Sequence, residues 1–118
     1  MKPFDIFGWQ PPGWPEPHPC VIVSHPSRVA NKGEVNVVAC SSRRATRPAT
    51  ANEIILDAAD GLDWPTLCKC DLLYSVPKPE LKHRRGQVSS ERKKSERKKL
   101  LVRTMLGALG WGEVLAAA

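Results

Sequence analysis

The chain has 118 residues, of which 42% are apolar, and a net charge of +6, which suits one domain with a single modest core. No apolar run approaches the roughly 18 residues that a transmembrane helix needs, so a membrane-spanning protein is excluded. Residues 1–13 lack the continuous apolar segment of a signal peptide. We therefore expect a cytoplasmic protein whose cysteines are reduced.

Short apolar runs separated by turn-forming residues predict a series of β-strands. In chain order these strands are expected at residues 2–9, 20–24, 34–41, 54–56 and 66–76. The segments between them, 10–19, 25–33, 42–53 and 57–65, are expected to be loops, the first because it holds five prolines.

A basic helix is predicted at about residues 89–110, within a single domain of residues 1–118. It contains the direct repeat Ser-Glu-Arg-Lys-Lys, built from helix formers, with Ser89 or Ser90 as its N-cap. The first two turns have no apolar face and should be solvated. A later apolar stripe should pack on the core, and three glycines should loosen and then end the helix. The stripe is Leu101, Met105, Ala108 and Leu109, and the glycines are Gly107, Gly110 and Gly112.

Several short strands and one terminal helix predict a mainly β protein, namely a small, partly closed antiparallel barrel with the helix packed on it. The basic residues are concentrated toward the end of this predicted architecture. Ten Lys and Arg lie between Lys82 and Arg103, opposed only by Glu91 and Glu96, whereas the rest of the chain is slightly acidic. Such clustering favours contact with a polyanion, nucleic acid above all, although a solvated helix face is the alternative.

Four cysteines stand at positions 20, 40, 68 and 70, in or beside apolar runs. Structural zinc sites usually place two ligands on a turn with two to four residues between them, which this pattern does not provide. We predict buried core thiols, with no metal ion and no cofactor.

The stretch "TLCKCDLLYSV", residues 66–76, combines these cysteines with charged side chains. Side chains alternate faces along a strand, so Cys68, Cys70 and Leu72 should point one way. Lys69, Asp71 and Leu73 should point the other way. A cation and a carboxylate then share a face, either as a pair for acid–base chemistry or as a plain surface ion pair.

The segments "HPCVIVSHPSRVAN", "NVVACSS", "GLDWPTLCKCDLLYSVPKPEL" and "RRGQVS" follow one another in this order. Together, over about residues 4 to 110, they resemble the MazF/PemK family of toxin endoribonucleases. The resemblance implies an SH3-like barrel of the MazF/CcdB type that forms a homodimer and binds a cognate antitoxin. It also implies sequence-selective cleavage of single-stranded RNA by metal-independent acid–base chemistry, as in type II toxin–antitoxin systems.

The resemblance also implies roles for particular residues. The Arg-Cys-Asp triplet of PemK-like members reads Lys69-Cys70-Asp71 here, so Asp71 would be the general base and Lys69 the cation or acid. The family's Arg-Pro is replaced by His18-Pro19. Histidine can do acid–base work, but it lacks the bidentate fork of an arginine, and His18 could equally be an exposed loop residue. Ser41 stands where the family has a threonine.

Several further residues are candidates for contact with RNA or a partner. Ser42, Arg43, Arg44 and Arg47 follow the predicted strand end near the family's substrate groove, and we expect them to bind RNA. Trp9 and Trp14 flank the proline-rich loop and could stack on a base, dock on a partner or, for Trp9, belong to the core. Trp64 is expected to be structural.

Two other functions remain open from the sequence. The CcdB toxins share the fold, bind gyrase without doing chemistry, and end in Trp-Gly plus an apolar residue, whereas this chain has "GWGEVLAAA" at residues 110–118. A catalytically degenerate member that binds RNA or antitoxin without cleaving is the other possibility. The Lys69-Cys70-Asp71 strand favours the ribonuclease over the CcdB-like toxin.

Overall fold

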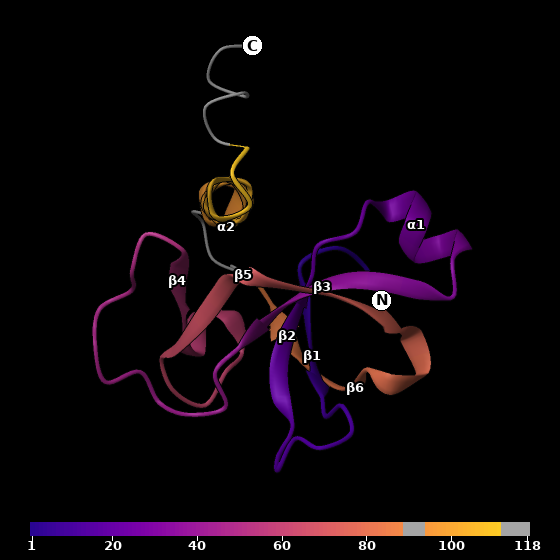
Figure 1. The fold of residues 1–118 in the computed structure, drawn as a ribbon, viewed down its shortest axis with the longest axis horizontal. Helices are drawn as coiled ribbons and strands as arrows, with labels where there is room; N and C mark the ends of the chain where they lie inside the picture. The colour runs from indigo at the N-terminus through magenta and orange to yellow at the C-terminus, as the bar shows by residue number, and fades with distance from the viewer. Residues whose placement is uncertain (89–93, 112–118) are drawn as a thin grey trace.

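The computed structural model describes residues 1–88 and 94–111, and its centre is one six-stranded antiparallel sheet that curls into a half-barrel (Figure 1). The strands are β1 (Asp5–Trp9), β2 (His18–Ile22), β3 (Glu34–Cys40), β4 (Glu53–Leu56), β5 (Thr66–Pro77) and β6 (Lys82–Gln87). The helices are α1 (Pro26–Asn31) and α2 (Lys94–Ala108), with single 3-10 turns η1 (Ala58–Asp60) and η2 (Lys78–Glu80). The strand order is β4-β5-β3-β2-β1-β6. The predicted fold class, mainly β with a C-terminal helix, is confirmed.

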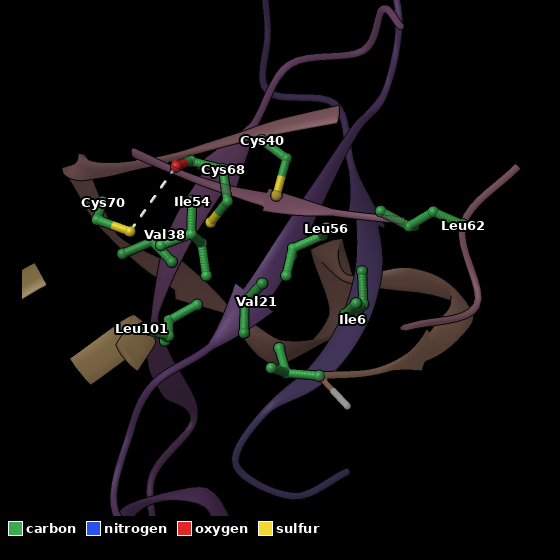
Figure 2. Packing of buried hydrophobic residues seen from close by; sticks show 11 residues of the cluster. Ile6, Val21, Val38, Cys40, Ile54, Leu56, Leu62, Cys68, Cys70 and Leu101 are labelled. Carbon is green, nitrogen blue, oxygen red and sulfur yellow. Dashed lines mark hydrogen bonds between the residues drawn. The ribbon is translucent and has the colours of Figure 1, made fainter. Parts of the chain in front are cut away.

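Both faces of the sheet are buried at its centre, which explains the continuous apolar runs of the central strands. On β3, Val35 and Val37 belong to one apolar cluster, whereas Val38 and Cys40 belong to the other. The first cluster includes Val29 of α1. The second is completed by Leu101 of α2 and is drawn in Figure 2. The two helices thus cover two separate cores of one sheet.

Along β5, the side chains from Cys68 alternate between buried and more exposed positions as predicted, but only as far as Asp71. Cys68 and Cys70 are fully buried, Lys69 is half-buried, and Asp71 is exposed. Leu72, expected to lie with the cysteines, is 37% exposed. The reason is a bulge: Val38 pairs with Leu73 but its neighbour Ala39 pairs with Lys69, so three residues of β5 have no place in the ladder.

The curled sheet is closed by a close approach between η1 and β6. Gly61 has φ of 94° and follows η1, and a Cβ there would lie 2.6 Å from the carbonyl oxygen of Arg85. A Cβ at Gly86 would clash with the carbonyl oxygen of Asp60. The two segments can cross at this distance only because both positions are glycine. This crossing brings β6 beside the turn that follows β4.

Three elements differ from the sequence-based expectation. Strand β2 begins at His18 rather than at residue 20, so His18 is a strand residue. Helix α1 replaces part of the expected loop 25–33, because His25 caps it by accepting a hydrogen bond from the Ser27 N–H and Pro26 starts it. Strand β6 was not predicted at all. It is an exposed edge strand with no apolar alternation.

Helix α2 is observed from Lys94, the last residue of the first repeat. The predicted cap and the rest of that repeat, residues 89–93, lie outside the described residues. Leu101 is fully buried and Met105 packs against the core, as predicted. Leu109, also assigned to the stripe, is 41% exposed and does not pack there, since the helix ends at Ala108. Gly110 terminates the helix at a φ of 89°. Gly112 lies outside the described residues.

Neither helix in the described part of the chain has the length and apolar character needed to cross a membrane.

Candidate functional site

Lys69 and Asp71 line one open pocket of about 350 Å³ beside β5, which we call the lysine pocket. Its other lining residues are Thr50, Asn52, Glu53 and Leu72. The bulge of β5 positions the pocket, because it turns Asp71 and Leu72 out of the strand ladder. The predicted sharing of one surface by Lys69 and Asp71 is therefore confirmed.

The ion-pair partner of Lys69 is Glu53, a residue that the sequence did not single out. Pairing of β4 with β5 places Glu53 opposite Lys69, and the Lys69 Nζ donates to Glu53 Oε2 at 3.2 Å. Arg47 donates two further bonds to the same carboxylate, at 2.7 and 2.9 Å, and the Thr50 N–H a third, at 3.0 Å. Glu53 thus joins Arg47, predicted to bind RNA, to Lys69.

The carboxylate of Glu53 is buried, but its charge is well compensated. Hydrogen bonds from Arg47, above all, hold the pKa of Glu53 well below its usual range, against the burial that would raise it. Bonds from Thr50 and Lys69 add to this lowering of the pKa. Lys69 therefore lies next to a carboxylate that is ionised at neutral pH and holds the lysine ammonium group in place at the pocket wall.

Ser41 and Ser42 line a second, smaller pocket of about 140 Å³, which we call the serine pocket. Its wall also includes Pro17, Pro19, Asp63, Trp64, Thr66 and Arg85. The Thr66 hydroxyl donates to the Ser41 carbonyl oxygen at 2.7 Å and so fixes the end of β3 against the start of β5. Trp64, expected to be structural, also lines this pocket and is 38% exposed.

The two serines use their hydroxyl groups differently. The Ser41 oxygen accepts a bond from the Arg43 N–H at 3.2 Å, which leaves its hydroxyl hydrogen for another acceptor. The Ser42 hydroxyl donates to Glu16 at 2.6 Å. Arg43 and Arg44 are exposed beside the pocket, and the Arg44 guanidinium lies 6.0 Å from the centre of the Trp64 ring. Of the four predicted RNA-binding residues, Ser42 thus lines this pocket, and Arg43 and Arg44 follow it in the chain as exposed cations.

His18 lines neither pocket. Its Nδ1 lies 3.0 Å from the Cys40 carbonyl oxygen, and because a carbonyl can only accept, Nδ1 carries the hydrogen. Its ring packs edge-on against Trp14, with ring centres 4.5 Å apart. Trp14 in turn contacts Tyr74 and Trp9, and the Trp9 indole N–H donates to Glu80. Trp9 is buried, so of its open alternatives the core role is confirmed.

The four cysteines are buried free thiols, as predicted. Burial raises the pKa of Cys20 to about 12. Hydrogen bonding among the thiols, and then burial, raises the pKa of Cys68 and Cys70 well above the usual value. Figure 2 shows Cys40, Cys68 and Cys70 within the core. In residues 1–88 and 94–111, no three His, Cys, Asp or Glu side chains gather as ligands of one metal ion.

The predicted catalytic residues therefore occupy three neighbouring places rather than one. Lys69 and Asp71 share the lysine pocket, Ser41 lies in the serine pocket, and His18 bonds the residue before Ser41. Thr66 of the serine pocket and Lys69 of the lysine pocket are three residues apart on β5, and the two pockets share no lining residue.

Known structures confirm the fold. The Mycobacterium tuberculosis toxin MazF-mt6 superposes with a TM-score of 0.72 at 20% identity, over 90% of this chain and 96% of that one. A mycobacterial endoribonuclease in complex with its cognate antitoxin gives 0.73 at 20% identity, over 93% and 95%. MazE-MazF from Deinococcus radiodurans gives 0.61 at 14% identity, over 98% and 94%.

No curated protein sequence matches the chain significantly. The family profile of the PemK-like, MazF-like toxins of type II toxin-antitoxin systems matches residues 8–102. This range contains both pockets, the start of α2 and all strands of the sheet except the first three residues of β1. The chain thus belongs to the PemK-like, MazF-like toxin family.

Proposed function

We propose that the protein is a sequence-selective endoribonuclease toxin that cleaves single-stranded RNA by metal-independent acid–base chemistry. The observation that carries the proposal is the lysine pocket, where an exposed carboxylate and an ammonium group line one open surface. Family membership supports it, since relatives with this fold include endoribonucleases. An RNA substrate of this kind places its site of action in the cytoplasm.

The reaction needs a base, a proton donor and a cation. The Asp71 carboxylate would take the proton of a ribose 2′-hydroxyl, and the 2′-oxygen would attack the adjacent phosphorus. The bond from phosphorus to the 5′-oxygen then breaks, and this oxygen takes a proton from Lys69 or from water. Lys69 also stabilises the charge that develops on the phosphorane. The products are a 2′,3′-cyclic phosphate and a 5′-hydroxyl.

The other predicted residues support this reaction from the neighbouring surface. The Ser41 hydroxyl can donate to a phosphate oxygen from the serine pocket. His18 would act through Nε2, because Nδ1 is held by the Cys40 carbonyl. Ser42, Arg43 and Arg44 would contact the RNA at and beside the serine pocket, and Arg47 would act mainly through Glu53, to which it is already bonded.

Cleavage of a long mixed-sequence RNA by the purified protein, with and without a chelator, tests the proposal. We expect fragments with 2′,3′-cyclic phosphate and 5′-hydroxyl ends, cut at a recurring short motif, at the same rate in both conditions. Asp71→Asn should lower turnover by about 10²-fold or more, because it removes the base while keeping the shape. Glu34→Gln, which changes another exposed carboxylate, should leave turnover unchanged.

Four outcomes would contradict the proposal. Fragments with 5′-phosphate ends, or loss of activity with the chelator, would exclude the mechanism. Full activity in Asp71→Asn would exclude its base. A protein that binds antitoxin or gyrase but leaves all RNA intact would favour a degenerate or CcdB-like member instead.

The proposal includes two protein partners. Relatives of the same fold are known in complex with an antitoxin, namely the mycobacterial endoribonuclease and the MazE-MazF assembly of Deinococcus radiodurans. We infer that this chain likewise binds a cognate antitoxin, and that it forms a homodimer. Exposed leucine side chains, among them Leu72 of the lysine pocket, support the dimer.

A further inference from the structure

The serine pocket has a basic residue that the predicted site did not include. Arg85 of β6 lines this pocket together with Ser41, Ser42 and Thr66. His18, which stands where a family member would carry arginine, does not line the pocket and bonds the Cys40 carbonyl oxygen instead. The guanidinium group of Arg85 therefore reaches the serine pocket from β6, whereas His18 belongs to β2.

The backbone around Arg85 is fixed in place by the crossing of η1 and β6. The carbonyl oxygen of Arg85 lies so close to Gly61 that no side chain fits at that position. The next residue, Gly86, lies against Asp60 in the same way. Because both contacts are between backbone atoms, the start of the Arg85 side chain has a defined position at the rim of the serine pocket.

The guanidinium of Arg85 has an exchangeable partner. It donates to Asp63 Oδ2 at 3.0 Å, and the side chain of Asp63 is 73% exposed. An ion pair open to water in this way contributes little to stability, so its carboxylate is readily replaced by another anion. An RNA phosphate likewise accepts two parallel bonds from a guanidinium, in the fork geometry that suits a carboxylate.

We propose that Arg85 binds an RNA phosphate in the serine pocket, releasing Asp63 when the substrate enters. The Ser41 hydroxyl donates to the same phosphate group, so the pocket offers a planar cation on one wall and a hydroxyl on another. Its volume of about 140 Å³ lies below the usual range for whole small-molecule ligands, which suits a phosphate group rather than a base. The inference rests on the proposed RNA substrate.

Four variants test this assignment, with cleavage of mixed-sequence RNA as the first measurement. Arg85→Gln should lower kcat/KM by about 10²-fold, as expected when one donor to a developing anion is lost. Arg85→Lys should recover only part of the loss, because lysine keeps the charge but not the fork. Lys82→Gln removes one charge from the same strand outside the serine pocket and should leave kcat/KM nearly unchanged.

Asp63→Asn distinguishes phosphate binding from a structural role of the ion pair. If Arg85 serves the substrate, freeing it from Asp63 keeps or raises kcat/KM. If the pair only stabilises the fold, Arg85→Gln and Asp63→Asn should reduce activity and thermal stability together. Equal losses in these two variants, or wild-type activity in Arg85→Gln, would overturn the assignment.

Binding of a fully 2′-O-methylated RNA pool, which cannot be cleaved, separates this inference from the proposed activity. Arg85→Gln should bind this pool about 10-fold or more weakly than the wild type, as for loss of a hydrogen bond to a charged group. Lys82→Gln should bind nearly as the wild type does. If the wild-type protein cleaves no RNA, this binding measurement alone tests the phosphate site. A loss of affinity in Arg85→Gln but not in Lys82→Gln supports the site, and equal affinities of Arg85→Gln and the wild type refute it.

Discussion

Glu53 shows why single residues of the site could be only partly predicted. Lys69 and Asp71 are two residues apart in a recognisable strand, so their shared surface follows from the alternation of side chains. Glu53 lies 16 residues before Lys69 and 6 after Arg47, and only the pairing of β4 with β5 brings the three together. Nothing local in the sequence marks such a contact. The same holds for Arg85, which reaches the serine pocket only through the glycine crossing.

The buried carboxylate of Glu53 predicts a dependence of stability on pH. Its pKa is lowered in the folded protein, so its contribution to stability is complete above the unfolded-state value of about 4.3. This contribution is lost as the pH falls from there through the lower folded-state pKa. Glu53→Gln should be less stable by about 2 kcal/mol at neutral pH, and the difference should shrink at pH 3.

Urea unfolding at the two pH values measures this difference, with Glu34→Gln as the control for an exposed carboxylate. The control should differ from the wild type by at most about 0.5 kcal/mol at either pH. A Glu53→Gln deficit that is equally large at both pH values would show that the ionised carboxylate is not its source.

Among the elements, those with buried apolar faces were predictable and those without were not. Strands β3 and β5 lie between both cores, and their valine, leucine and cysteine residues identify them directly. Strand β6 reads "KHRRGQ" and lies at the edge of the sheet, where its side chains face solvent or form ion pairs. Helix α1 has only six residues, several of which are common in turns. A segment this short is too short to show the helical spacing of apolar residues in the sequence.

The basic segment from Lys82 to Arg103 is less available for RNA than its composition indicates. Among the cations of this segment that the structure describes, four already contact the protein. They are Arg84 with Asp5, Arg85 with Asp63, Arg97 with Asp60, and Lys98 over the ring of Phe4. Part of the charge cluster therefore serves to attach β6 and α2 to the sheet rather than to attract a polyanion.

Arg97 is the strongest of these attachments and carries a prediction for α2. Its guanidinium donates to Asp60 at 2.7 Å and to the Ile55 carbonyl oxygen at 3.1 Å, and the Asp60 side chain is fully buried. Arg97→Met keeps the apolar stem but removes a charged partner of a buried carboxylate. We expect a loss of about 2 kcal/mol in the free energy of unfolding.

Arg103→Met is the matched control, because Arg103 lies on the same helix and is exposed. It should change the stability by no more than about 0.5 kcal/mol in the same urea titration. Equal stabilities of the two variants would mean that the bond to Asp60 does not hold α2 on the sheet.

At the scale of the whole molecule, the lysine pocket lies beside apolar surface that the described chain leaves uncovered. Leu72 of the β5 bulge, the next residue Leu73 and Leu100 of α2 are 37%, 41% and 47% exposed, and we call them the leucine patch. Leu72 and Leu100 line neighbouring hollows that share Thr50 and Glu53. Exposed apolar side chains gathered in this way are typical of a protein interface.

We expect the leucine patch to be part of the homodimer interface, so that dimerisation and cleavage depend on one another. Sedimentation equilibrium at micromolar protein should give twice the chain mass of 13.0 kDa. The double variant Leu72→Ser/Leu73→Ser should shift the protein toward the monomer and lower RNA cleavage, because the second chain would complete the wall of the lysine pocket. Trp64→Ser, which changes an exposed apolar residue outside the patch, should stay dimeric. A wild-type monomer would refute the dimer, and a fully dimeric double variant would place its interface elsewhere.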